Sequence, residues 1–223
     1  MKGRLIVIEG LDGSGKATQT ARLENELRTR GYAVKRVSFP DYDEPSSALV
    51  KMYLGGEFGT EPKSVNAYAA SSFYAVDRYA SYKRFWQKDY EEGTVILADR
   101  YVTSNAIYQM VKLPQNEWMP FLDWLCDYEY VRLGLPRPDD VIYLDMPPEV
   151  SQKLLLNRYA GDESKKDIHE SHVEFLKQCR DAAYFAAKAW GWCRIACAED
   201  GQPRSVESIA GELIDAILKE DFA

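Results

Sequence analysis

Short runs of apolar residues alternate along this chain with longer stretches in which apolar and polar positions recur at helical spacing. Five of these runs predict β-strands, namely Leu5–Ile8, Ala33–Ser38, Val95–Ala98, Val141–Leu144 and Cys193–Cys197. Each run is apolar at nearly every position, and this pattern is typical of strands that are covered on both faces in a parallel sheet.

Helices are expected between these strands. The helical stretches run from about Lys16 to Arg30, from about Ser64 to Tyr90, from Pro147 onward, from about Asp167 to Trp190 and from Arg204 to Lys219. Gly31 is well placed to end the first of them. The alternation of strand and helix predicts a parallel α/β sheet with right-handed crossovers, in which ligands bind at the carboxyl ends of the strands.

A glycine-rich segment follows the first strand and precedes the first helix. Its spacing, Gly10-x-x-x-x-Gly15-Lys16, has a clear meaning in that context. Glycines let the backbone wrap closely around phosphate, and the helix N-terminus adds positive potential. Lys16 would contribute a point charge to the β- and γ-phosphates of ATP. We therefore predict that ATP binds residues 10–18, which are Gly10, Leu11, Asp12, Gly13, Ser14, Gly15, Lys16, Ala17 and Thr18.

Ala17 departs from this pattern, because a Ser or Thr hydroxyl that binds Mg²⁺ normally follows the lysine. Three explanations remain open. Magnesium is held through water and other acids, or Thr18 compensates, or the affinity for the metal is weakened. We favour the first, since adjacent helical residues point about 100° apart and Thr18 would have to reach round the helix.

Two further polar clusters accompany the predicted strands and helices. Asp99-Arg100-Tyr101 directly follows the strand Val95–Ala98, so Asp99 can hold the magnesium shell through water and Arg100 can grip phosphate. Tyr74 and Arg78 are four residues apart and share one helix face. That arrangement suits the stacking of a base and hydrogen bonding to its edge.

Charge and composition narrow the choice of function. The net charge of −7 argues against general nucleic-acid binding, and cations would have to gather locally at any anionic substrate. The four cysteines are scattered and there are two histidines, so a disulfide framework or a zinc site is not expected. No apolar run approaches the length of a signal peptide or a membrane span, which makes a cytoplasmic protein with no membrane partner the default.

Several motifs together resemble thymidylate kinases, a family of P-loop nucleoside-monophosphate kinases. They are Val7-Ile8-Glu9-Gly10-Leu11-Asp12-Gly13-Ser14-Gly15-Lys16, Phe39-Pro40-Asp41, Tyr74-Ala75-Val76-Asp77-Arg78, Asp99-Arg100-Tyr101 and Tyr143-Leu144-Asp145-Met146-Pro147-Pro148-Glu149-Val150. The order and spacing match over nearly the whole chain. The resemblance implies a three-layer P-loop NTPase fold, in which a five-stranded parallel sheet is flanked by helices. It implies one such domain over residues 1–223, with a lid at about 155–170.

The resemblance also implies the reaction and its residues. ATP would donate its γ-phosphoryl group to dTMP, with Mg²⁺ as cofactor, and the protein would often be a homodimer. Catalysis would involve Asp12, Lys16, Arg100 and a basic lid residue. In this family a basic residue comes either from the phosphate loop or from the lid. The loop position here is Gly13, so the lid should supply the basic residue, with Arg158 the best candidate and Lys165 or Lys166 behind it. The expected acceptor site consists of Phe39, Pro40, Tyr74, Arg78, Arg100, Ser104, Asn105, Tyr108 and Gln109.

Two other functions stay open at this point. A related kinase acting on another nucleoside monophosphate, or on a deoxynucleoside, would carry much the same motifs. A P-loop protein that binds nucleotide with weak or no kinase activity is favoured by Ala17 alone. The acceptor-side residues Tyr74, Arg78 and Arg100 weigh against that second alternative, because a nucleotide switch would not need them.

Overall fold

The computed structural model describes residues 2–158 and 173–219. Its central sheet contains five parallel strands in the order β2-β3-β1-β4-β5. The strands are β1 (Leu5–Gly10), β2 (Val34–Ser38), β3 (Val95–Asp99), β4 (Asp140–Asp145) and β5 (Cys193–Ala196). A small antiparallel pair, β6 (Ala198–Glu199) and β7 (Gln202–Pro203), follows. All five predicted strands are confirmed, and so is the parallel α/β sheet.

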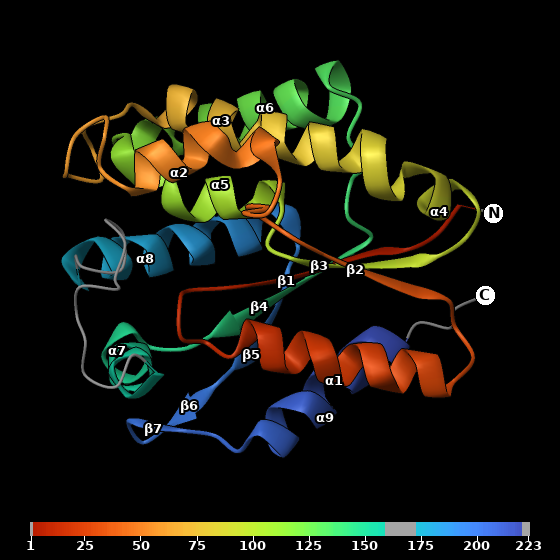
Figure 1. The fold of residues 1–223 in the computed structure, drawn as a ribbon. Coiled ribbons are helices and arrows are strands. Elements are labelled where there is room, and N and C mark those ends of the chain that lie inside the picture. Colours follow the sequence, from red (N-terminus) through yellow and green to blue (C-terminus); the bar gives the residue numbers. More distant parts are fainter. Residues whose placement is uncertain (1, 159–172, 220–223) are drawn as a thin grey trace.

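Helices cover both faces of the sheet, and Figure 1 shows the three layers. On one face lie α1 (Lys16–Thr29) and α9 (Val206–Leu218). On the other lie α2 (Ala48–Leu54), α3 (Ala67–Ser81), α4 (Gln87–Glu91), α5 (Val102–Tyr108), α6 (Trp118–Leu125) and α8 (Val173–Trp190). The π-helices η2 (Tyr82–Trp86) and η5 (Cys126–Arg132) continue α3 and α6, and α7 (Pro148–Arg158) follows β4. Short 3₁₀ turns occur at Pro45–Ser47, Met110–Lys112 and Gln115–Glu117.

The alternation of side chains along β1 builds the core on both sides of the sheet. Ile6 and Ile8 belong to the apolar cluster formed with α1 and α9, whereas Leu5 and Val7 belong to the cluster formed with η2 and α4. All four are fully buried. Because successive residues of a strand point to opposite faces, a continuous apolar run can fill two cores at once.

The expectation that every strand is covered on both faces is wrong for the two outer strands. In β2 Val34 is buried while Arg36 and Ser38 are exposed, and in β5 Ile195 is buried while its neighbours are exposed. Both strands lie at the edges of the sheet. An edge strand has a neighbour on one side, and its polar side chains remain in water there.

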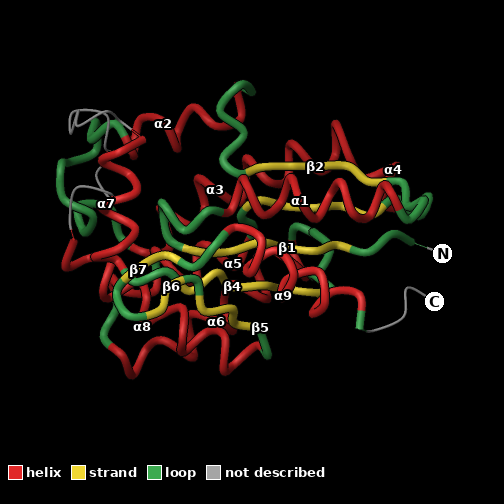
Figure 2. The backbone as a smooth tube through the Cα atoms, turned by 90° about the horizontal axis from the view of Figure 1, so that it is seen from below, coloured by secondary structure: helices red, strands yellow, loops and turns green. Residues whose placement is uncertain are grey.

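The carboxyl ends of the strands lie at one end of the molecule. In the sheet register Ile8 pairs with Asp99 and Gly10 pairs with Leu144. Figure 2 shows that α2 and α7 lie at this same end, beyond the strands. The predicted helix over Ser64–Tyr90 is seen as α3, η2 and α4 in succession, with Asn66 capping its start through a 2.9 Å bond from Ala69 N–H. The first part of the helix expected from Asp167 lies outside the described residues.

Candidate active site

The phosphate loop is the turn from β1 into α1, and glycines are required at two of its positions by close contacts. A Cβ on Gly10 would lie 2.5 Å from Ser14 Oγ and 2.9 Å from Leu144 O. A Cβ on Gly13, whose φ is 78°, would lie 2.7 Å from Ser151 O at the start of α7. Gly15 has φ 89° directly before the helix. These positive φ values turn successive backbone N–H groups to one side, which is the geometry of an anion-binding nest.

Lys16 holds the loop from inside. Its Nζ donates to the carbonyl oxygens of Gly10 at 2.9 Å and Leu11 at 3.0 Å, and lies 3.8 Å from Asp12 Oδ1. Burial lowers the pKa of Lys16, and the neighbouring charge of Arg100 adds to this effect. A buried ammonium bonded to two carbonyls keeps a strong attraction for a phosphate oxygen, because little water competes for it.

Arg100 pairs with Asp12 of the phosphate loop. Its Nη2 donates to Asp12 Oδ1 at 2.5 Å, and its guanidinium lies 5.0 Å from the centre of the Tyr108 ring. Tyr108 OH donates to Asp12 Oδ2 at 3.2 Å. Burial opposes ionisation of Asp12, but the charges of Arg100 and Lys16 outweigh it and hold the pKa of Asp12 well below its usual range. The site therefore combines two cations with one carboxylate that stays ionised.

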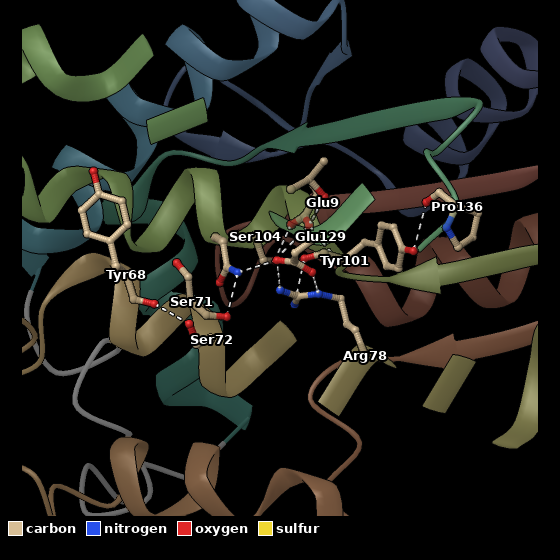
Figure 3. Close-up of polar contacts among 11 residues, drawn as sticks. Glu9, Tyr68, Ser71, Ser72, Arg78, Tyr101, Ser104, Glu129 and Pro136 are labelled. Atoms are coloured by element: carbon tan, nitrogen blue, oxygen red, sulfur yellow. Dashed lines mark hydrogen bonds and ion pairs between the residues drawn. The ribbon is translucent and has the colours of Figure 1, made fainter. Parts of the chain in front are cut away.

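Glu9, the residue before the loop, anchors the backbone directly after Arg100, and Figure 3 shows it beside Tyr101 and Ser104. It is fully buried at the carboxyl end of β1, and its Oε1 accepts from Tyr101 N–H at 3.1 Å, from Thr103 Oγ1 at 2.7 Å and from Ser104 Oγ at 2.9 Å. These donors are the backbone of Tyr101, which directly precedes α5, and two hydroxyls of the first turn of that helix, so Glu9 of β1 anchors the start of α5. Burial raises the pKa of Glu9, while the nearby Arg100 charge opposes that shift. Arg100 itself is held at φ 67°, a strained conformation for a non-glycine residue.

The site predicted from the sequence does not include Glu9. A charged residue inside the apolar run of a central strand, directly before the phosphate loop, was a usable signal. Buried carboxylates need hydrogen-bond donors, so such a position indicates a polar network rather than plain core.

One pocket of about 790 Å³ joins the phosphate loop to the acceptor-side residues. Its lining contains the nine residues predicted for the acceptor site, which are Phe39, Pro40, Tyr74, Arg78, Arg100, Ser104, Asn105, Tyr108 and Gln109. It also contains Asp12, Gly13, Gly15, Lys16, Ala17, Thr18 and Asp99. Ser38, Tyr42, Leu54, Leu154 and Leu155 complete it. Helices α2, α3, α5 and α7 thus bring together residues that are far apart in the sequence.

The acceptor-side residues differ in how deeply they are buried and in how many contacts they make with the rest of the protein. Phe39 is almost fully buried against Tyr101, and the Phe39–Pro40 peptide bond is cis. Tyr74 is half-buried and its ring meets that of Tyr53 edge-on at 6.4 Å. Gln109 is buried, and its Oε1 accepts no hydrogen bond from the described residues. That oxygen is therefore a candidate acceptor for a group in the pocket.

Arg78 is more deeply engaged than a plain binding residue. It is 1% exposed, and its guanidinium makes a two-pronged ion pair with Glu129, with Nε to Oε2 at 2.7 Å and Nη2 to Oε1 at 2.6 Å. Nη1 donates to the Tyr101 carbonyl at 3.3 Å. Burial opposes the charge of Arg78, but Glu129 outweighs it and raises its pKa. The sequence carried no clear sign of Glu129, which lies in an aromatic helical stretch.

Other predicted residues have different places. Leu11 lies in the hydrophobic core and the Ser14 hydroxyl is buried, so these two residues can offer backbone groups to a phosphate. Ala17 and Thr18 are exposed in the first turn of α1. Arg158 is the last residue of α7, and its side chain lies outside the described part of the chain, as do Lys165 and Lys166.

The carboxylates that line the pocket fit a magnesium ion that arrives bound to a nucleotide. Within residues 2–158 and 173–219, no group of three or more His, Cys, Asp or Glu side chains could hold a metal ion. Asp12 and Asp99 both line the pocket. Mg²⁺ in proteins keeps several waters and is commonly held by one or two carboxylates together with phosphate oxygens, which is what this donor set allows.

Comparison with known proteins gives a consistent result. Residues 8–209 match the family model of thymidylate kinase. The chain is 34% identical to the thymidylate kinase of Mycobacterium tuberculosis over 84% of this chain and 87% of that protein. It is 33% identical to a probable thymidylate kinase of Pyrococcus horikoshii over 100% of this chain and 98% of that protein. The solved structure of thymidylate kinase from Candida albicans matches its fold with a TM-score of 0.68 and 21% identity, covering 97% of this chain and 91% of that one.

Proposed function

This chain belongs to the thymidylate kinase family, and from that premise we propose that it transfers the γ-phosphoryl group of ATP to dTMP, giving dTDP and ADP. The observation that carries the proposal is the continuous pocket, in which an ATP-phosphate loop and a base-binding wall share one cavity. A protein that used nucleotide as a switch would not need the second half of that cavity. The enzyme is accordingly an ATP-dependent nucleoside-monophosphate kinase.

The reaction needs positioning and charge cancellation more than covalent chemistry. Lys16 binds the β- and γ-phosphates of ATP, and Arg100 bridges toward the acceptor phosphate. Asp12 holds the guanidinium of Arg100 between the two anions through the contact already described. Mg²⁺ bound with ATP would neutralise charge on the phosphate oxygens, and Asp99 would hold the ion through its water shell. Arg158 and the segment at 155–170 would add a further cation and exclude water.

The acceptor base is recognised by complementary hydrogen-bonding groups. Arg78 can only donate. Asn105 uses both N–H groups of its amide, one to Glu129 Oε1 at 3.0 Å and one to Ser71 O at 3.3 Å, so its carbonyl oxygen remains to accept. A thymine ring offers a 4-carbonyl beside an N3–H group, which matches a donor next to an acceptor. Tyr74 supplies the stacking face, as its place in the pocket wall allows.

A coupled ADP-release assay tests the function and its alternatives together. We expect dTMP to have the highest kcat/KM among dTMP, dUMP, dCMP, dGMP and UMP, and ATP alone to release little ADP. A higher kcat/KM for another monophosphate would show that this other nucleotide, and not dTMP, is the acceptor. Binding of ATP without ADP release for any acceptor would favour a nucleotide-binding protein without kinase activity.

A homodimer is part of the proposal. Three large side chains of α3, Tyr68, Val76 and Tyr79, are about two-fifths exposed and recur on one face of the helix. Apolar and aromatic side chains gathered on one helix face favour burial against a second copy.

Among the helices of the described residues, none has both the length and the apolar character needed to cross a membrane. We propose a cytoplasmic location, and one domain over the whole chain.

A further inference from the structure

Glu129 is a carboxylate with no exposure at all, in the π-helix η5. Figure 3 shows it facing Arg78. Its two oxygens take two parallel N–H bonds from Arg78, the geometry in which a guanidinium is most firmly oriented. The same Oε1 also accepts from Asn105 Nδ2 at 3.0 Å. One carboxylate therefore holds two residues of the pocket wall.

We propose that Glu129 is a positioning residue for recognition of the acceptor base, an inference that rests on the proposed function. Its carboxylate fixes the plane of the Arg78 guanidinium. It also determines which end of the Asn105 amide is free, because an acceptor on one side of the amide must face the N–H₂ group. With the amide turned this way, the wall presents a donor from Arg78 and an acceptor from Asn105.

This polarity distinguishes pyrimidines by chemistry alone. Thymine and uracil carry a 4-carbonyl acceptor next to an N3–H donor, and both pair with the wall. Cytosine carries a 4-amino donor next to an N3 acceptor. Its amino group would face the donor of Arg78 and its N3 would face the acceptor of Asn105, so neither could form a hydrogen bond. A buried site that leaves polar groups unpaired rejects a ligand strongly. Glu129 thus acts on specificity without touching the base.

A purely structural role accounts poorly for these groups. Replacing a buried ion pair by well-packed apolar side chains is often neutral or stabilising, so folding alone does not call for Arg78 and Glu129 at this place. The carboxylate also lies in a π-helix, a distortion that occurs frequently at functional sites. Finally, the Arg78 contact to the Tyr101 carbonyl ties this pair to the residue that follows Arg100.

Kinetics of Glu129→Gln and Glu129→Asp test the proposal. Gln removes the charge and adds a donor, which allows the Asn105 amide to turn over, while Asp keeps the charge and withdraws it by one methylene. For both variants we expect KM for dTMP to rise about tenfold or more, with KM for ATP within about twofold of wild type. The preference for dTMP over dCMP should fall by a similar factor. Glu92→Gln, an exposed carboxylate of the turn after α4, is the matched control.

The outcomes separate the two levels of inference. If the variants fold with lower thermal stability but keep the wild-type KM for dTMP and the wild-type preference over dCMP, Glu129 is structural and the proposal is wrong. If Glu129→Gln does not fold, Glu129→Asp alone decides by the same two measurements. Wild-type protein that turns over no pyrimidine monophosphate would contradict the proposed function itself, whereas normal wild-type turnover with unaltered variants contradicts the role of Glu129 alone.

Discussion

At the scale of single residues, the protonation state of each charged side chain in the site depends on its charged neighbours. Asp12 is ionised because two cations surround it, Lys16 loses proton affinity through burial, and Arg100 is held in a strained backbone conformation by the network of Glu9. Backbone strain and closely spaced opposite charges are typical of functional sites. The two cations outnumber the Asp12 carboxylate, so the site favours an anionic ligand.

Arg100→Glu is the residue-scale test of that charge balance. The change removes the cation that we propose acts beside the transferring phosphate and places a second carboxylate near Asp12, so we expect kcat to fall by about 10³-fold. The same change at Lys88, which is 84% exposed on α4, should leave kcat within about twofold. ADP release with ATP and dTMP measures both. Near-normal turnover of the Arg100 variant would remove this residue from the reaction.

Lys112 gives a pH dependence of stability. Its Nζ donates to Tyr53 OH at 2.8 Å and to Val65 O at 2.9 Å, and burial lowers its pKa from 10.5 to about 7. Between these two values the unfolded chain binds a proton that the folded chain has released. Stability therefore rises with pH across this window, and the cost of burying the charge is present in full below about pH 7.

Thermal unfolding of Lys112→Met at several pH values measures this effect. The melting temperature of wild type minus that of the variant should increase steadily from about pH 7 to about pH 10, because methionine does not titrate. Loss of the two hydrogen bonds shifts the absolute stability of the variant by an amount that does not depend on pH. A constant difference would mean that Lys112 keeps an ordinary pKa.

At the scale of elements, the phosphate loop is pressed against the start of α7. Gly13 has φ 78°, and an added Cβ would meet the Ser151 carbonyl at 2.7 Å. The loop and α7 must therefore move apart if any side chain enters between them. Such a movement would displace the N–H groups that are to hold phosphate.

Gly13→Ala is expected to raise KM for ATP about tenfold or more and to lower the melting temperature. Gly211→Ala provides the matched control, because Gly211 lies within α9 and a Cβ there meets nothing within 4 Å. Alanine in a helix interior should stabilise it by about 0.5–1 kcal/mol and leave the kinetics unchanged. Calorimetry and ATP titrations compare the two. Equal behaviour of the two variants would show that the close approach at Gly13 has no functional consequence.

At the scale of the whole molecule, the negative net charge and the cationic pocket act together. A chain with net charge −7 attracts anionic nucleotides only where cations are concentrated, and here Lys16, Arg78 and Arg100 line one pocket. The outer face of α3 belongs to the same layer as the pocket wall, so an interface there would stiffen the helix that carries Tyr74 and Arg78.

Light scattering after size exclusion tests the dimer. We expect twice the 25.5 kDa mass of one chain for the wild type, and one chain mass for Val76→Glu combined with Tyr79→Glu. Val206→Glu changes a similarly exposed apolar residue on α9, across the sheet, and should remain dimeric. A wild type that stays monomeric at micromolar concentration would overturn the proposal.

Much of the fold was predictable because its signals are local. Continuous apolar runs identify strands of a parallel sheet, and the glycine spacing at Gly10–Gly15 identifies a phosphate loop. The short helices α2, α5 and α6 were not predicted. Helices of seven or eight residues are marginal alone and form through tertiary packing, as when Glu9 of β1 accepts a hydrogen bond from the Thr103 hydroxyl of α5.

By itself, then, the sequence determined the parallel α/β class and the glycine-rich turn from β1 into α1, since each follows from neighbours in the chain, whereas most residues of the acceptor wall were expected from the family resemblance. Tertiary structure alone decided the partners. Arg100 pairs with Asp12, 88 positions away, and Arg78 pairs with Glu129, 51 positions away. The reason is physical. Buried charges must find opposite charges or donors, and which of them come within reach depends on how the strands and helices pack.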